Sequence, residues 1–378
     1  MGSVFEICNG YENSVLAHAI AEELGTSDDT SFSSAELESV TQIAVDGLGS
    51  FDGFQCLPNL QRLAVGASTA VDLGPLAGLS RLADITIGRS AAPDFDTLTH
   101  GTRALASSLV RLSVVQCEAE DLTGLGALTA LRILDLSENR TADLSELGAL
   151  TKLEELDLHG NRVVDLAALA SLQALRTLNL DANQVESLEG LTGLGALSLL
   201  RVTANRLTSI GSVDLPGLIV LEAGMNAVEM MGNVSGMPTL ETLNLRENQL
   251  RDIAGIESLT KLVTLTLSDN ALSDLAPLAG LGTLETLDLS NSGVEALQPL
   301  EDLAHVVDLD LRNSLVSDLS PLFGWASAPT SPCRKLAVSE ALLDETSTQR
   351  VVPALCAGPW QVQGDTGFLC EKSSCNPI

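Results

Sequence analysis

Acidic side chains at a regular spacing are the residues of this chain that could do chemistry. They form two groups of three: Asp135, Glu155 and Asp157, and Asp288, Asp308 and Asp310. Clustered carboxylates can attract a basic protein or bind a divalent cation weakly, and they can also be only a solvated acidic surface. All three interpretations stay open, because no further oxygen ligands can be assigned from the spacing.

The histidines and cysteines complete no catalytic or metal-binding motif. The four histidines occupy unrelated positions, and the sequence contains no C-x-x-C pair, H-E-x-x-H, P-loop or G-x-S-x-G motif. His159 lies beside Glu155 and Asp157, where a lone exposed histidine is a simpler interpretation than a general base. We therefore predict a protein that is not an enzyme and that holds no cofactor and no metal ion.

The charge restricts the partners. With 50 acidic and 20 basic residues, the formal net charge is -30. Such a surface repels nucleic acid and anionic membranes, so it favours a protein partner with a basic surface and predicts no nucleic-acid binding. No apolar run is long enough for a transmembrane segment. The first ten residues do not form a secretory signal peptide, so an exported form would need a signal that this sequence lacks.

Leucines recur with a step of 22 residues through most of the chain. The frame is L-x-x-L-x-x-L-x-L-x-x-N-x-V/L-x-x-L-x-x-L-x-x, and about twelve copies begin between Leu57 and Leu303. It combines the two-residue period of a strand with the three-residue period of 3₁₀ turns. One such unit cannot bury its leucines alone, whereas stacked units can, with parallel strands about 4.8 Å apart.

The frame resembles leucine-rich repeats over residues 57–324. That resemblance implies an α/β solenoid, a horseshoe or arc with a concave parallel β-sheet and convex 3₁₀ or turn segments. Residues 13–25 predict an amphipathic helix that ends at Gly25, and Ser33 to Glu36 form a capping box for a second helix.

This N-terminal cap and the first repeat resemble bacterial internalins. The residues that carry the resemblance are Leu16, Ala19, Ile20, Leu24, Gly25, Glu36, Leu37, Thr41, Gly53, Leu57, Asn59, Leu60 and Leu63. Internalins typically continue into an immunoglobulin-like domain, which this chain does not match.

Three regions follow from these patterns. We predict a helical cap at 1–56, the repeat array at 57–324 and a C-terminal cap at 325–378. An insertion at 91–103 is expected to bulge outward and expose Phe95. In the C-terminal cap we expect strands at 336–338 and 360–363 and a helix that starts near Thr346.

The asparagine of each frame predicts a buried ladder whose amides satisfy backbone groups at the bend after each strand. Its members are Asn139, Asn161, Asn183, Asn205, Asn226, Asn248 and Asn270. Cys117 falls on the same rung and is predicted to be a buried structural thiol. Ser292 and Ser314 close the series.

The other six cysteines lie in the two caps: Cys8, Cys56, Cys333, Cys356, Cys370 and Cys375. The first two bracket the N-terminal cap, which suggests one disulfide, and the last four allow two more in three connectivities. Cap disulfides favour an oxidising compartment, so we expect an extracellular, periplasmic or cell-surface protein. Reduced cysteines in a cytosolic protein are the alternative.

Residues that alternate with the strand leucines should face the concave side. The candidate partner-binding residues there are Asp135, Glu155, Asp157, Asp181, Arg201, Glu222, Arg246, Asp288, Asp308, Asp310 and Arg312. Leu199, Val220 and Met225 form a small apolar spot. Four methionines, at 225, 230, 231 and 237, are expected to fill the core in place of leucine.

The function predicted from the sequence is a protein-interaction scaffold. Our first hypothesis is a monomeric, secreted or cell-surface bacterial protein that resembles internalins and binds a protein partner through its acidic concave face. A second hypothesis is an intracellular regulatory subunit of an enzyme such as a phosphatase, because similar repeats occur in such subunits. A structural envelope component is the third, and it would self-associate.

Overall fold

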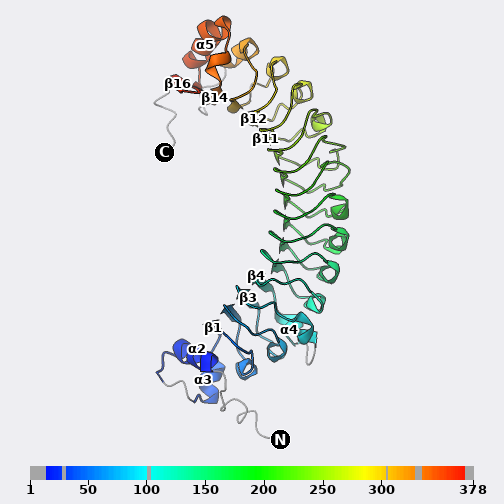
Figure 1. The fold of residues 1–378 in the computed structure, drawn as a ribbon, viewed down its shortest axis with the longest axis vertical. Helices are drawn as coiled ribbons and strands as arrows, with labels where there is room; N and C mark the ends of the chain where they lie inside the picture. The colour runs from blue at the N-terminus through cyan, green and yellow to red at the C-terminus, as the bar shows by residue number, and fades with distance from the viewer. Residues whose placement is uncertain (1–13, 28–30, 100–103, 304, 328–333, 371–378) are drawn as a thin grey trace. The chain divides into compact units, whose positions relative to one another are not determined.

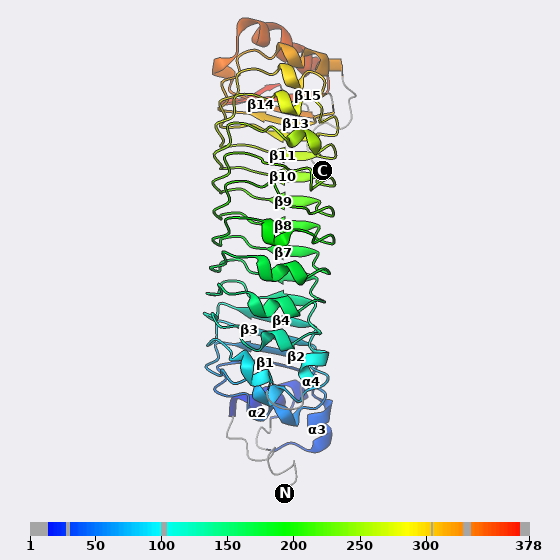
Figure 2. The ribbon, with the colours of Figure 1, turned by 90° about the vertical axis from the view of Figure 1, so that its right-hand side faces the viewer.

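The computed structural model describes residues 14–27, 31–99, 104–303, 305–327 and 334–370. It divides into two compact units, Met1–Gln184 and Val185–Ile378. Within each unit the chain winds through successive coils, with a strand on one side of the coil and a 3₁₀ or turn segment on the other (Figures 1 and 2). The predicted α/β solenoid is confirmed. The division into two caps and an array, at 56/57 and 324/325, stays a prediction.

The first unit contains strands β1 to β7 in sequence order, each paired in parallel with the next. The strands are β1 (Gln42–Asp46), β2 (Arg62–Gly66), β3 (Asp84–Gly88), β4 (Arg111–Val115), β5 (Ile133–Asp135), β6 (Glu155–Asp157) and β7 (Thr177–Asn179). The helices are α2 (Ser14–Leu24), α3 (Ser34–Ser39) and α4 (Ala104–Ser108). The 3₁₀ turns are η1 (Phe54–Cys56), η2 (Gly74–Leu76), η3 (Phe95–Thr99), η4 (Leu125–Ala127), η5 (Ser145–Ala149) and η6 (Ala167–Ser171).

In the second unit, the strands from β8 to β15 are parallel and β16 pairs antiparallel with β15. The strands are β8 (Leu199–Arg201), β9 (Val220–Glu222), β10 (Thr242–Asn244), β11 (Thr264–Thr266), β12 (Thr286–Asp288), β13 (Asp308–Leu311), β14 (Arg334–Val338), β15 (Trp360–Gly364) and β16 (Gly367–Cys370). The 3₁₀ turns are η7 (Glu189–Leu191), η8 (Ile256–Ser258), η9 (Ala276–Leu278), η10 (Gln298–Leu300), η11 (Ser320–Ser327) and η12 (Glu340–Leu342). A π-helical turn, η13 (Ser347–Val351), leads into α5 (Val352–Ala357).

The leucines of the frame form the core of each unit. In the three-residue strands the central leucine is buried and its two neighbours face outward, as in β6, where Leu156 is 1 % exposed. The register pairs this leucine with Leu134 of β5 and Leu178 of β7, so equivalent residues of successive coils stack. Burial of such columns removes apolar surface that a single coil would leave in water.

Asparagine side chains tie each coil to its neighbour at the bend after the strand. The Asn161 amide donates to the carbonyl oxygens of Leu136, Leu158 and His159 at 2.9–3.2 Å and accepts from the Thr141 N–H at 2.9 Å. Asn139, Asn183 and Asn270 are buried in the same way, whereas Asn205, Asn226 and Asn248 are half-buried. A residue with positive φ precedes each rung, such as Glu138 at φ 57°.

Cys117 occupies the rung before Asn139. Its N–H donates to the Asn139 side-chain oxygen at 3.0 Å, and its sulfur lies 3.3 Å from the Val115 carbonyl oxygen. Burial raises the pKa of this thiol. At the other end of the series, the Ser292 and Ser314 hydroxyls donate to carbonyl oxygens three residues earlier, at 2.6 and 2.7 Å.

The expectation that Phe95 is exposed is wrong. Its side chain is 1 % exposed, because η3 packs between η2 and η4 and takes the ring into the core. The expectation for the methionines is half wrong. Met231 and Met237 are buried, whereas Met225 and Met230 are 52 % and 60 % exposed.

The N-terminal cap closes the first coil with α2 packed against β1. Leu16 and Ile20 of α2 are fully buried. The capping box at α3 is present: the Glu36 N–H donates to the Ser33 hydroxyl, and the Ser33 N–H donates to the Glu36 carboxylate. Strand β1 was not predicted, although Ile43 and Val45 alternate with polar residues. None of the helices among the described residues is long and apolar enough to cross a membrane.

The C-terminal cap is built on the chain's two tryptophans. The rings of Trp325 and Trp360 stack with centroids 5.4 Å apart, and the Trp360 indole N–H donates to the Trp325 carbonyl oxygen at 3.1 Å. Arg334 lies over Trp360, and burial lowers the pKa of its guanidinium. The two predicted strands correspond to β14 and β15, and the predicted helix to η13 and α5. The hairpin to β16 was not predicted.

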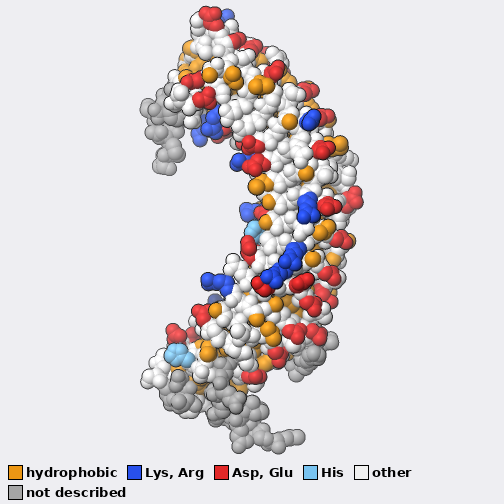
Figure 3. Space-filling view, in the orientation of Figure 1, with side chains coloured by type: hydrophobic (Ala, Val, Ile, Leu, Met, Phe, Trp, Pro, Cys, Tyr) orange, Lys and Arg blue, Asp and Glu red, His pale blue; other side chains and the backbone are white. Residues whose placement is uncertain are grey.

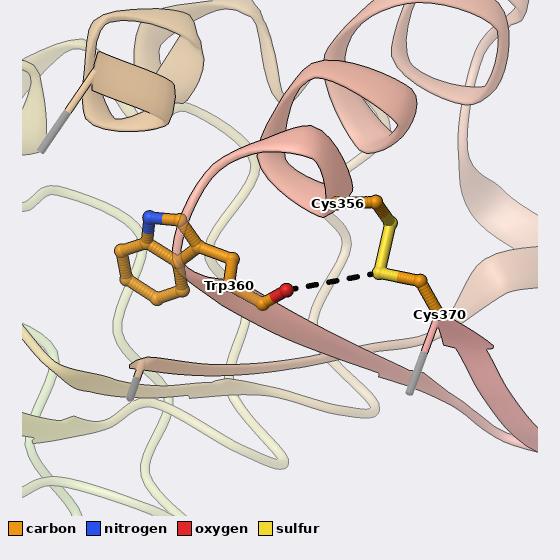
Figure 4. Close-up of a disulfide and its surroundings, with 3 residues drawn as sticks. All are labelled: Cys356, Trp360 and Cys370. Atoms are coloured by element: carbon orange, nitrogen blue, oxygen red, sulfur yellow. Dashed lines mark hydrogen bonds between the residues drawn. A yellow bond between two sulfur atoms is a disulfide. The ribbon is translucent and has the colours of Figure 1, made fainter. Parts of the chain in front are cut away.

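A disulfide between Cys356 and Cys370 joins the end of α5 to β16 (Figure 4). The Cys370 sulfur lies 3.8 Å from the carbonyl oxygen of Trp360. Cys56 is also disulfide-bonded, while Cys117 is free. The remaining candidates, Cys8, Cys333 and Cys375, lie outside the described residues.

The asparagine ladder predicts a site-specific loss of stability. In Asn161→Ala, the buried partners of the amide lose their hydrogen bonds, so the free energy of unfolding should fall by about 2–3 kcal/mol in urea titration. Asn248→Ala should cost less, because its rung is half-buried and water can replace the amide. Equal losses for the two variants would contradict this account.

The cap disulfide predicts both a labelling pattern and a stability change. Alkylation of the denatured, unreduced protein should label Cys117 and leave Cys356 and Cys370 unmodified. Cys370→Ser should lower the free energy of unfolding by roughly 3 kcal/mol, as expected for a closed loop of this length. Cys117→Ser serves as the comparison without a disulfide. Labelling of Cys356 in the unreduced protein would refute the prediction.

Candidate interaction surface

Outward-facing strand residues form rows across each unit, here called the sheet face. It is the side that the sequence predicts to be concave. Because the strands pair in register, residues at one frame position lie side by side on adjacent strands. Asp135 is thus opposite Asp157 in the first unit, and Asp288 is opposite Asp310 in the second. The backbone ladder fixes these positions before any partner arrives.

The first acidic group, Asp135, Glu155 and Asp157, faces off β5 and β6. Asp135 accepts hydrogen bonds from the Ser113 hydroxyl at 3.2 Å and from the Ser137 N–H at 2.9 Å. Asp157 accepts from the His159 N–H at 2.8 Å and from the Asn179 amide at 3.1 Å. None of the ion pairs within the described residues involves this group. Its three charges therefore remain open to a cationic partner.

The second acidic group, Asp288, Asp308 and Asp310, differs because basic side chains accompany it. The Arg312 guanidinium is paired with Asp310, and Lys335 of β14 is opposite Asp308 in register. Burial raises the pKa of Asp308, as do the charges of Asp310 and Asp288, while Lys335 and Arg312 oppose that change. This group is partly neutralised within the chain. Sequence analysis missed Lys335 because it lies outside the regular frame.

The remaining candidates are distributed over the sheet face and its edge. Arg246 pairs with Glu247 at 3.0 Å and with Asp269 at 3.1 Å, so its charge is already engaged. Asp181 follows β7 and is half-buried. Arg201 is exposed, and no ion pair of the described residues includes it. Glu222, opposite Arg201, accepts from the Asn244 amide at 2.8 Å.

His159 lies at the edge of the first acidic group and pairs with a carboxylate of the preceding coil. Its Nε2 lies 3.0 Å from a carboxylate oxygen of Glu138, on the preceding coil. Among the described residues, no group of three or more His, Cys, Asp or Glu side chains is placed to hold a metal ion.

A second row of aspartates begins the 3₁₀ and turn segments away from the sheet face. Each accepts a hydrogen bond from the N–H two residues later, at 2.7–3.1 Å: Asp72, Asp94, Asp121, Asp143, Asp165, Asp252, Asp274 and Asp318. Hydrogen bonds from Thr123 lower the pKa of Asp121, and those from Ser145 lower that of Asp143. Some of the acidic residues thus stabilise turns within the fold, a role that the sequence analysis did not recognise.

Charged side chains of both signs cover the visible surface of each unit (Figure 3). In the first unit Arg132 pairs with Glu154 beside β5 and β6, and Arg140 pairs with Glu118 at 2.8 Å. These pairs are exposed and contribute little to stability.

The coils over residues 129–193 and 238–280 are leucine-rich repeats. A family model for leucine-rich repeats in two copies matches residues 129–171, 151–193 and 238–280. No curated protein matches the chain significantly.

Among solved structures, the fold is similar to that of internalins. An internalin (InlF) from Listeria monocytogenes is 27% identical with a TM-score of 0.71, covering 84% of this chain and 94% of that chain. The functional domain of InlJ from the same organism, which includes a cysteine ladder, is 18% identical with a TM-score of 0.58, covering 86% and 79%. A plant peptide hormone receptor, RGFR1 in complex with RGF2, is 19% identical with a TM-score of 0.56, covering 87% and 63%.

Because the pKa of Asp308 is raised, replacing this carboxylate by a neutral side chain should stabilise the fold by an amount that depends on pH. The folded state binds this proton more tightly than the unfolded state, whose pKa is near 3.8. The group's stabilising contribution is therefore present below about pH 4 and lost as the pH rises through the folded pKa. Asp308→Asn should raise the free energy of unfolding at pH 7 by roughly 0.2–1 kcal/mol.

Thermal unfolding of both proteins at pH 7 and pH 3 measures this difference. The exposed Asp302, replaced by Asn, provides the control and should show little gain at pH 7. An Asp308→Asn gain that is as large at pH 3 as at pH 7 would exclude the electrostatic cause.

Proposed function

We propose that this protein is a non-catalytic scaffold that binds a protein partner through its sheet face, outside the cytosol of a bacterium. The observation that carries the proposal is the first acidic group. Asp135, Glu155 and Asp157 project from a rigid ladder, and no cation of the described residues neutralises them by an ion pair. A basic surface on the partner would supply the positive charges that balance these three carboxylates.

Preorganisation supports this role. The local hydrogen bonds to Asp135 and Asp157 hold both carboxylates before binding, so little ordering entropy remains to be lost. The similarity to an internalin over most of both chains agrees with an interaction scaffold. RGFR1 illustrates, with its bound RGF2, that a repeat fold of this kind accommodates a partner.

Disulfides support the location. The Cys356–Cys370 bond and the disulfide-bonded Cys56 both belong to the predicted caps, and such bonds persist in oxidising compartments. This favours a secreted or cell-surface protein over an intracellular regulatory subunit. A monomer that binds a separate partner, rather than a self-associating envelope component, is the form we propose.

Neutralisation of the first acidic group tests the proposed function. The triple variant Asp135→Asn, Glu155→Gln, Asp157→Asn should bind a synthetic peptide of alternating lysine and serine roughly tenfold more weakly than the unmodified chain. The affinity falls because the lysines of the peptide no longer face carboxylates on adjacent strands. Fluorescence anisotropy at several salt concentrations measures it, and the difference should shrink as salt increases.

A second triple variant controls for net charge. Glu120→Gln, Glu186→Gln and Glu295→Gln removes three exposed carboxylates that lie at one frame position away from the sheet face. It should weaken binding by less than about twofold. If the two variants lose affinity equally, the acidic surface is only solvated charge and the proposed site is rejected.

A further inference from the structure

One coil of the second unit departs from its neighbours by exposing apolar side chains. This coil, residues 215–236 and here called the β9 coil, carries Ile219, Met225 and Met230. They are 41 %, 52 % and 60 % exposed, and they make up three of the ten large apolar side chains exposed by the described residues. Met230 holds the position of Asp252, away from the sheet face, so Ile219 and Met225 are the two exposed apolar side chains at the ends of the strand, and exposed apolar surface is typical of binding sites.

Two of these side chains border an apolar area on the sheet face. Val220 of β9 is opposite Leu199 of β8 in register, and both are half-buried. Ile219 precedes Val220 at the edge of the sheet. In the neighbouring coils the position of Leu199 and Val220 is held by threonine: Thr242, Thr264 and Thr286. The apolar pair is therefore specific to β8 and β9, and stacking of the coils does not require it.

Met225 lies at the other end of β9 in an unfavourable backbone conformation. Its φ is 54°, in the left-handed region that glycine, asparagine and aspartate tolerate best. Every equivalent position has positive φ, and other coils place there glycine, aspartate or asparagine and also longer side chains such as Glu138 and Glu247. A methionine there is both strained and exposed. Its flexible, polarizable side chain suits an adaptable apolar contact.

Polar side chains lie between the Leu199–Val220 pair and Met225, and they determine which kind of ligand could bind there. Arg201 extends from β8 on the same face as Leu199, about 7 Å further along the strand. It is exposed and takes part in none of the ion pairs among the described residues. Glu222 opposite it is already bonded to Asn244. Gly224 then leaves no side chain between Glu222 and Met225.

We propose that the strip formed by Leu199, Ile219, Val220, Arg201 and Met225 docks an extended segment of a partner protein. The segment presents an apolar side chain to the Leu199–Val220 pair, a carboxylate to Arg201 and a second apolar side chain to Met225. Alternate residues of an extended chain lie about 7 Å apart on one face, which matches this order. The inference rests on the proposed function, because it names a second contact of the same sheet face.

A designed peptide tests the strip directly. It carries leucine, aspartate and leucine at alternate positions with serine between them. The full chain is labelled with ¹³C in the methionine methyl groups, and the peptide is added to millimolar concentration. The Met225 methyl resonance should shift, while those of the buried Met231 and Met237 should not. The peptide with lysine in place of aspartate should bind roughly tenfold more weakly.

Variants that copy residues of the neighbouring coils locate the contact without disturbing the fold. Leu199→Thr combined with Val220→Thr should weaken the peptide roughly tenfold. Arg201→Asn, which copies Asn244, should abolish the preference for aspartate over lysine. Val164→Glu, which removes an exposed apolar side chain from the first unit, should have no effect.

Three outcomes would overturn the inference: no Met225 shift at millimolar peptide, equal binding of the lysine peptide, or equal weakening by Val164→Glu. A concentration-dependent Met225 shift without peptide would assign the strip to a second copy of this chain instead. If this peptide fails while the lysine–serine peptide still depends on the first acidic group, the proposed function stands and this strip is rejected.

Discussion

The asparagine rung is the interaction on which the rest of the molecule depends. Strands β5 to β12 are three residues long, and a strand of that length supplies too few hydrogen bonds to hold its neighbour. The amide of Asn161 adds two hydrogen bonds to the preceding coil, one donated to Leu136 and one accepted from Thr141, and donates two more within its own coil, to Leu158 and His159. Removing it would leave buried carbonyl and N–H groups without partners, which costs more than the bonds contribute. The same asparagine therefore fixes both the stacking of adjacent coils and the bend after the strand.

Because the rung and the leucines fix the coil, an outward strand residue such as Glu155 has no part in the stacking, although Asp135 and Asp157 also accept backbone N–H bonds at the end of the strand. The outward residues can vary from coil to coil, and the ladder still places them at the same spacing. The same reasoning separates two kinds of acid. Asp143 and its equivalents begin turns and are held by backbone N–H groups, whereas Glu155 faces off the sheet without such a role. Net charge alone cannot distinguish the two.

The periodic part of the fold was predictable because one physical rule repeats in it. The 22-residue step gave the parallel strands, the turns and the positions of residues such as Asn139 and Asp135. Where the period ends, prediction was incomplete: β1 and β16, in the predicted caps, were missed, and Lys335 enters the sheet face from an irregular coil. Ion pairs such as that of Arg246 with Asp269 were not predicted either, because the repeat frame does not determine the direction of side chains at the edge of a sheet.

The β9 coil shows how a repeat can reveal function by its exceptions. Other coils offer residues that suit each of its unusual positions: glutamate for Ile219, as in Glu241, and aspartate for Met225 and Met230, as in Asp269 and Asp252. The coil instead exposes apolar side chains, has a methionine at the positive-φ position that Glu138 and Glu247 hold in other coils, and forgoes a turn-capping carboxylate. Coils with polar residues at these exposed positions stack in the same way, and the core of this coil differs separately, with Ala223, Met231 and Val234 at positions that leucine holds in the coil of β11. Local rules broken without a structural gain indicate a surface adapted to something outside the chain.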